Sequence, residues 1–156
     1  IYKLTQTDCF SEDTGLEVLA LDGKPGVKSA RYAGEECNNA ANIAKLLKAM
    51  ENIENRTAQF KTVISLMMNG EEIQFTGICK GKIATSLKGE NGFGYDPVFI
   101  PDGSHLHFAE MTMGEKNNFS HRKKATQLLI NYLSEKYGQN QNRSSSKQLN
   151  QANPCR

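Results

Sequence analysis

The pattern of apolar and polar residues changes its period along the chain and predicts both strands and helices. Apolar residues alternate over residues 58–68 and again over 71–79, which is typical of half-buried β-strands. Asn69-Gly70 lies between the two segments and is the dipeptide most typical of a two-residue hairpin. Shorter strands are predicted at residues 16–18 and 98–100. At least part of the sheet is therefore expected to be antiparallel.

Two other segments have helical periodicity. The first covers residues 38–50, where Asn38 is a suitable N-cap. The second covers residues 121–137, follows the N-cap residue Ser120, and is predicted to end at Gly138. Together the segments predict an α/β fold in which helices flank a mixed sheet.

The chain length fits one domain followed by a polar tail. Of the 156 residues, 1–138 carry the periodic patterns and are assigned to the folded domain. Residues 139–156 are mostly Gln, Asn and Ser, and a tail of that composition is predicted to be disordered.

Charge and cysteine content narrow the function classes. The net charge of +2 does not favour binding to nucleic acid, and no apolar run is long enough to predict a membrane span. The four cysteines are scattered and form no CxxC pair, which favours reduced thiols in a cytoplasmic protein.

The start of the second helix has an unfavourable charge. Its first turn holds His121, Arg122, Lys123 and Lys124, whereas the N-terminal end of a helix is already partly positive. An anion bound to the free backbone N–H groups would reverse this repulsion, so the cluster suggests an anion site. The alternative is a solvated basic face on a surface helix.

A glycine-rich aromatic loop precedes that helix. Gly92 and Gly94 flank Phe93, so the backbone can adopt unusual dihedral angles or approach a ligand closely. Phe93 and Tyr95 could present a stacking face to a base, and Asp96 completes the loop. A purely structural turn with inward-facing aromatic rings explains the composition equally well.

A pair of carboxylates, Glu12 and Asp13, precedes Thr14 and Gly15. Magnesium is usually bound by one or two carboxylates together with waters and substrate phosphates. Taken alone, the motif could also be a polar turn. Asp-Thr-Gly also occurs in aspartic proteases, but only one copy is present in this chain.

Taken together, these motifs resemble those of the inosine/xanthosine triphosphate pyrophosphatase family. The matching blocks occur in order at residues 12–18, 26–34, 92–99, 108–110, and 115–117 with 120–122. The resemblance covers about residues 8–137. It implies an elongated α/β fold with a nucleotide cleft between two lobes, usually in a homodimer.

The resemblance also implies a reaction and a set of site residues. The family hydrolyses ITP, dITP and XTP to the monophosphate and pyrophosphate with Mg²⁺, which removes these non-standard purine nucleotides from the pool. Asp13 matches the catalytic, metal-binding acid. The substrate-binding positions match Thr14, Phe93, Gly94, Tyr95, Asp96, Lys116, His121 and Arg122. We hypothesise that His121 and Arg122 contact the 6-keto oxygen of the base, which a 6-amino purine lacks.

One family feature is not found ahead of Asp13. The family opens with a strand and a phosphate loop of the form Thr-x-Asn-x-x-Lys, and a Glu that follows helps to hold the metal. From its absence we expect a chain that lacks the N-terminal segment of the family. The alternative function is therefore a catalytically inactive remnant that binds nucleotides or dimerises.

Overall fold

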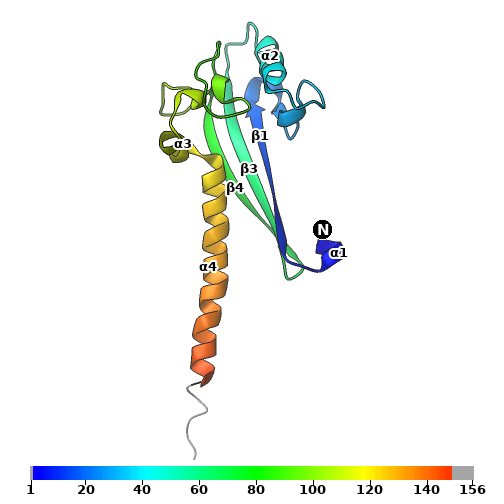
Figure 1. Ribbon diagram of the computed structural model, residues 1–156, viewed down its shortest axis with the longest axis vertical. Helices are drawn as coiled ribbons and strands as arrows, with labels where there is room; N and C mark the ends of the chain where they lie inside the picture. The colour runs from blue at the N-terminus through cyan, green and yellow to red at the C-terminus, as the bar shows by residue number, and fades with distance from the viewer. Residues whose placement is uncertain (1, 149–156) are drawn as a thin grey trace, which may run out of the picture.

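A long antiparallel hairpin forms the centre of the molecule. The structure is a computed structural model that describes residues 2–148 (Figure 1). Strands β3 (Thr57–Met68) and β4 (Glu71–Ile83) pair from Thr57↔Lys82 to Met68↔Glu71. Asn69 and Gly70 join them with φ angles of 51° and 84°, as the sequence predicted.

Three more strands complete the sheet, in the order β2-β1-β3-β4-β5. They are β1 (Cys9–Val18), β2 (Pro25–Gly26) and β5 (Phe99–Pro101). The α/β class is confirmed, but all four pairings between the described strands are antiparallel where a mixed sheet was predicted. β1 pairs with β2 only at Leu16 and Glu17, so its first half has no described strand on the outer side.

Helices cap the two ends of the sheet and run along it (Figure 1). The α-helices are α1 (Tyr2–Thr5), α2 (Asn39–Ala49), α3 (Met113–Phe119) and α4 (His121–Gln148). Short 3₁₀ helices lie at Leu19–Leu21, Ser29–Arg31, Asp96–Val98 and Phe108–Glu110. As predicted, the Asn38 side chain caps α2 by accepting a hydrogen bond from the Ala41 N–H. No helix among residues 2–148 is long and apolar enough to cross a bilayer.

Helix α4 is longer than the sequence predicted. It continues past Gly138 to Gln148, so the predicted end at Gly138 is wrong. The residues after Gly138 are rich in Gln, Asn and Ser and have no apolar periodicity, so pattern analysis cannot detect that the helix continues. The remainder of the predicted tail, residues 149–156, lies outside the described residues.

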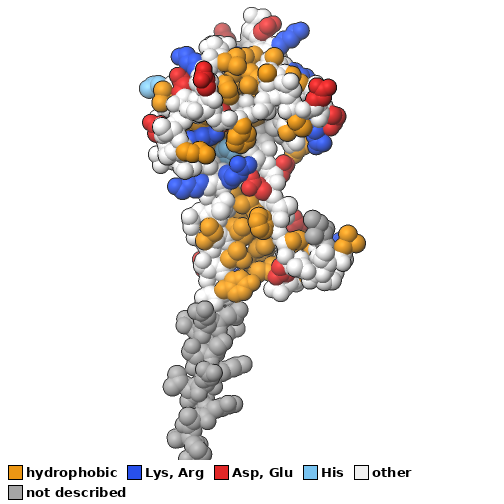
Figure 2. Space-filling model, in the orientation of Figure 1, with side chains coloured by type: hydrophobic (Ala, Val, Ile, Leu, Met, Phe, Trp, Pro, Cys, Tyr) orange, Lys and Arg blue, Asp and Glu red, His pale blue; other side chains and the backbone are white. Residues whose placement is uncertain are grey.

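Two hydrophobic clusters stabilise the fold. One lies beneath α2 and the loops at the upper end of the sheet, where Phe60, Phe99 and Phe108 pack against one another. The other lies under α4, where Phe75 of β4 packs with Ala125 and Leu129. Figure 2 shows Lys and Arg side chains gathered where the globular upper part meets the long helix, with hydrophobic side chains continuing below them.

Gly77 allows α4 to approach the sheet closely. A Cβ atom added at this position would lie 1.9 Å from the His121 carbonyl oxygen and 2.6 Å from the Ala125 nitrogen. A side chain is therefore excluded where α4 begins, and this contact fixes the distance between the first turn of α4 and β4.

Candidate functional site

A cavity of about 510 Å³ lies where β1, the 93–96 loop, α3 and the first turn of α4 meet. Its walls are formed by Glu12, Thr14, Gly15, Leu16, Ser29, Ala30, Asn39, Phe60, Phe93, Gly94, Tyr95, Asp96, Met113, Lys116, Asn117, Ser120, His121 and Arg122. A volume of this size is typical of a small-molecule site.

Strand β1 places alternate residues of the acidic motif on its two faces. Glu12 and Thr14 line the cavity, and the Thr14 hydroxyl lies 2.7 Å from the Thr62 hydroxyl of β3. Asp13 is exposed and is not among the cavity-lining residues. Because successive side chains of a strand point to opposite faces, Asp13 lies on the other face of the sheet.

The glycine-rich loop forms one wall of the cavity. Gly92 and Gly94 have positive φ angles of 81° and 60°, which confirms the unusual dihedrals expected for them. A side chain at Gly92 would also collide with the carboxylate of Asp96, at 2.1 Å from Oδ2. Phe93 is 65% exposed and is free to stack on a ligand, whereas Tyr95 is buried. The prediction that Tyr95 offers a stacking face is therefore wrong.

Tyr95 instead connects two parts of the site. Its hydroxyl donates a 2.8 Å hydrogen bond to the backbone carbonyl of Ser29, and burial raises the pKa of the phenol. The Ser29 hydroxyl accepts from the Leu16 N–H at 2.8 Å, so β1, Ser29 and the aromatic loop are joined in one network.

A buried ion pair lies beneath the aromatic loop. Lys116 Nζ is 2.5 Å from Asp96 Oδ2, and the same oxygen accepts the Phe93 N–H at 2.8 Å. The ammonium group also lies 5.3 Å from the ring centre of Phe93 and 5.1 Å from that of Phe108. The Asp96 side chain is only 5% exposed, and a carboxylate so deeply buried requires such a partner.

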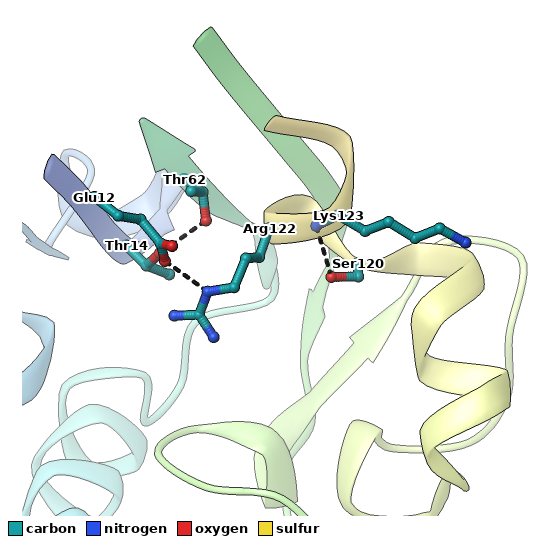
Figure 3. Close-up of polar contacts among 6 residues, drawn as sticks. All are labelled: Glu12, Thr14, Thr62, Ser120, Arg122 and Lys123. Atoms are coloured by element: carbon teal, nitrogen blue, oxygen red, sulfur yellow. Dashed lines mark hydrogen bonds and ion pairs between the residues drawn. The ribbon is translucent and has the colours of Figure 1, made fainter. Parts of the chain in front are cut away.

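The first turn of α4 is joined to the sheet through its basic residues (Figure 3). The Ser120 hydroxyl caps the helix by accepting the Lys123 N–H at 3.1 Å, as predicted. Arg122 Nε donates to Glu12 Oε1 at 2.5 Å, and Lys124 Nζ donates to the Ile78 carbonyl at 2.9 Å. The Lys123 side chain points away from Glu12 and Arg122. The basic cluster therefore connects α4 to β1 and β4. The free backbone N–H groups at the start of α4 are already partly capped by Ser120.

His121 adds no positive charge to this turn at neutral pH. Its imidazole is stacked on Phe60, with the ring centres 4.9 Å apart and an interplanar angle of 13°. Burial, together with the charges of Arg122 and Lys116, lowers the pKa of His121 from 6.5 to about 4. Nδ1 is buried without a hydrogen-bond partner among the described residues. His121 therefore lines the cavity as a neutral ring.

The sequence as a whole matches one protein family, described as the Ham1 family, over residues 1–132. The chain belongs to the Ham1 family. Among its curated relatives is the dITP/XTP pyrophosphatase of Flavobacterium johnsoniae, which is 56% identical over 126 residues. That alignment covers 81% of this chain and 66% of the relative. The dITP/XTP pyrophosphatase of Christiangramia forsetii is 54% identical, with 81% and 67% covered. The chain therefore spans about two thirds of the length of these relatives.

Solved Ham1 structures share the fold. The Staphylococcus aureus Ham1 protein superposes with a TM-score of 0.83 at 42% identity, covering 86% of this chain and 70% of that one. A HAM1 protein from Coxiella burnetii gives 0.80 at 39% identity, covering 84% and 69%. The resemblance and the elongated α/β fold predicted from the motifs are thus confirmed. The aspartic-protease alternative is wrong, since the Asp-Thr-Gly triplet of this Ham1 chain lies inside the continuous strand β1.

The cavity brings together every predicted substrate-binding residue and leaves out the predicted metal ligand, Asp13. The cavity residues that sequence reasoning did not assign to the site include Ser29, Phe60 and Glu12. Glu12 was considered only as a carboxylate beside Asp13. Ser29 lies within a family block and could have been found there. Phe60 has no local signal, because it looks like any alternating core residue of a strand.

The described residues contain no group of three or more His, Cys, Asp or Glu side chains that could hold a metal ion. This arrangement does not conflict with Mg²⁺, which usually takes one or two carboxylates and completes its shell with water and substrate phosphates. Asp13 suits that role, since its carboxylate is exposed and has no hydrogen-bond partner among residues 2–148. The carboxylates of Glu12 and Asp96 are already paired with Arg122 and Lys116.

Proposed function

We propose that this Ham1 protein hydrolyses the non-standard purine nucleoside triphosphates ITP, dITP and XTP to the monophosphate and pyrophosphate. The observation that carries the proposal is that one cavity gathers Thr14, the 93–96 loop, Lys116, His121 and Arg122 from three separate parts of the chain. Relatives that are 54–56% identical bear the name dITP/XTP pyrophosphatase, which supports the same chemistry.

The purine base fits the end of the cavity next to the aromatic loop. Phe93 is the exposed ring there, and stacking of a base on such a ring is worth about 1–3 kcal/mol. In this proposal, His121 and Arg122 on the first turn of α4 donate hydrogen bonds to a 6-keto oxygen, which their position in the cavity wall supports. A 6-amino purine would leave those donors unpaired, which is a strong basis for rejecting ATP.

The phosphates are proposed to extend across the edge of β1. Before Leu16 the described residues place no strand on the outer side of β1. A nucleotide whose base lies beside Thr14 can therefore reach Asp13 on the other face. In this proposal Asp13 would hold Mg²⁺, orient a water and accept its proton as the water attacks the α-phosphorus. When bound, Mg²⁺ supplies positive charge to the phosphates and to the departing pyrophosphate.

Pyrophosphate release tests the proposal. We expect release from dITP and XTP, but not from dATP, and only when Mg²⁺ is present. The Asp13→Asn variant should lose at least about a hundredfold in rate, in line with the loss of a general base. The matched control is Asp22→Asn, at an exposed aspartate that does not line the cavity, and this variant should keep the wild-type rate.

Two outcomes would contradict this assignment. Equal rates of pyrophosphate release from dITP and dATP would show that the cavity does not distinguish a 6-keto from a 6-amino purine. Tight binding of dITP without pyrophosphate release would favour the alternative function, a nucleotide-binding protein without catalysis.

A homodimer and a cytoplasmic location are further proposals, and both rest on the family resemblance. Analytical ultracentrifugation tests the first, with a single species of about 35 kDa expected from two chains of 17.3 kDa.

A further inference from the structure

Phe60 lies at the centre of the contacts that surround the site. It comes from β3, is only 8% exposed, and lines the cavity. Its ring is nearly parallel to the imidazole of His121 at 4.9 Å, meets Phe99 edge-on at 4.7 Å, and lies 6.0 Å from Phe108. Phe60 therefore connects the rigid aromatic core to a ring that faces the ligand.

The imidazole of His121 needs some means of orientation. In most functional histidines, a hydrogen bond to one ring nitrogen fixes the ring so that the other nitrogen can act. Here Nδ1 is buried and has no such partner among the described residues. Among the ring contacts of the described residues, the stack on Phe60 is the one that lies against the imidazole and can set its plane.

We propose that Phe60 is a positioning residue, which holds His121 so that Nε2 faces the purine base in the cavity. The inference rests on the proposed function, because it assumes that the base occupies this cavity. It assigns to a core phenylalanine a share in distinguishing 6-keto from 6-amino purines.

The charges around the imidazole are consistent with this role. Arg122, Lys116 and Lys124 disfavour its protonation, and Glu12 favours it. A cation above an aromatic face is also stabilised, so the Phe60 ring by itself would favour the protonated form. Burial has the largest influence on the His121 pKa. It outweighs the effects of Glu12 and of the Phe60 ring and keeps the imidazole neutral. A neutral imidazole buried on one face can hydrogen-bond a base without attracting phosphate to the same place.

Two leucine variants separate positioning from core stability. Phe60→Leu removes the ring that carries His121. Phe99→Leu removes a fully buried ring of the same aromatic cluster that has no ring contact with His121. We expect Phe60→Leu to lower the dITP/dATP ratio of kcat/KM at least tenfold, and Phe99→Leu to change that ratio less than threefold. Thermal unfolding establishes that each variant is folded at the assay temperature, and Phe60→Tyr, which retains the ring, should restore the ratio.

A spectroscopic measurement gives an independent result. The chain has three histidines, so the His121 signal can be assigned in proton NMR spectra by its loss in His121→Gln. In Phe60→Leu the imidazole becomes accessible to water, and its pKa should rise from about 4 towards 6.5. In Phe99→Leu the pKa should stay low.

The proposal is overturned if Phe60→Leu keeps both the wild-type dITP/dATP ratio and the low pKa of His121. It is also overturned if both leucine variants lower the ratio equally. If the wild-type protein releases no pyrophosphate at all, the proposed function fails instead. The His121 titration in the two variants then still decides whether Phe60 positions the ring.

Discussion

Replacing Gly77 of β4 with alanine should displace the first turn of α4 and so disturb the candidate site. The new Cβ would lie 1.9 Å from the His121 carbonyl oxygen, whereas ordinary contacts begin near 3.4 Å. The first turn of α4 must therefore retreat by about 1.5 Å, the difference between these distances. Overpacking typically costs about 1–3 kcal/mol. Both colliding partners are backbone atoms that cannot rotate away, so we expect a cost near about 3 kcal/mol.

The same displacement should weaken the site. The Arg122–Glu12 hydrogen bond of 2.5 Å would lengthen to about 4 Å if α4 moved straight away from the sheet, which is too long for a direct bond. The stack of His121 on Phe60 would also open. A misplacement of about 1 Å in a catalytic site can cost about a hundredfold in rate, so dITP hydrolysis should fall by that order.

Thermal unfolding with a matched control tests this reasoning. For a chain of this size, about 3 kcal/mol corresponds to a decrease in Tm of about 6–12 °C. Gly114 lies in α3, and a Cβ atom there would contact nothing within 4 Å. Gly114→Ala should therefore leave Tm unchanged or raise it slightly. The close contact between α4 and β4 is refuted if Gly77→Ala unfolds within about 2 °C of the wild type.

Three further perturbations have defined outcomes. Tyr95→Phe leaves the Ser29 carbonyl without its donor and should lower the free energy of unfolding by about 1 kcal/mol in urea titrations; an unchanged midpoint would contradict this. The free energy of unfolding should fall as the pH decreases from 6.5 to about 4, because His121 takes up a proton at 6.5 when unfolded but only near 4 when folded. His121→Gln should remove that part of the pH dependence. Gly138→Ala, within α4 and free of contacts, should raise helix stability by about 0.5–1 kcal/mol, measured by circular dichroism during thermal unfolding.

Local chemistry explains which parts of the fold were predictable. Asn69-Gly70 determines a hairpin because both residues tolerate positive φ, and Asn38 determines a helix start through its own side chain. The sequence analysis did not predict helix α3, although the sequence contains a signal for the start of this helix. Thr112 and Glu115 form a capping box there, in which the Thr112 hydroxyl accepts the Glu115 N–H and the Glu115 carboxylate accepts the Thr112 N–H.

Contacts between distant residues explain what was not predictable. Arg122 and Glu12 are 110 positions apart, so nothing near either residue indicates that they pair. The sequence predicted a cationic anion site at the start of α4, whereas the fold uses Arg122 and Lys124 to attach α4 to the sheet. The stacked position of the His121 ring likewise depends on Phe60, which lies in strand β3.

The most direct test of the account is calorimetric binding of dIMP and dAMP to the wild-type protein. These monophosphates differ at the 6-position of the purine and carry the same sugar and α-phosphate, so a difference in affinity reports on the base. We predict that dIMP binds and that dAMP binds roughly 5- to 150-fold more weakly, because one unpaired donor costs about 1–3 kcal/mol. Equal affinities for the two nucleotides would contradict the claim that this cavity recognises a 6-keto purine.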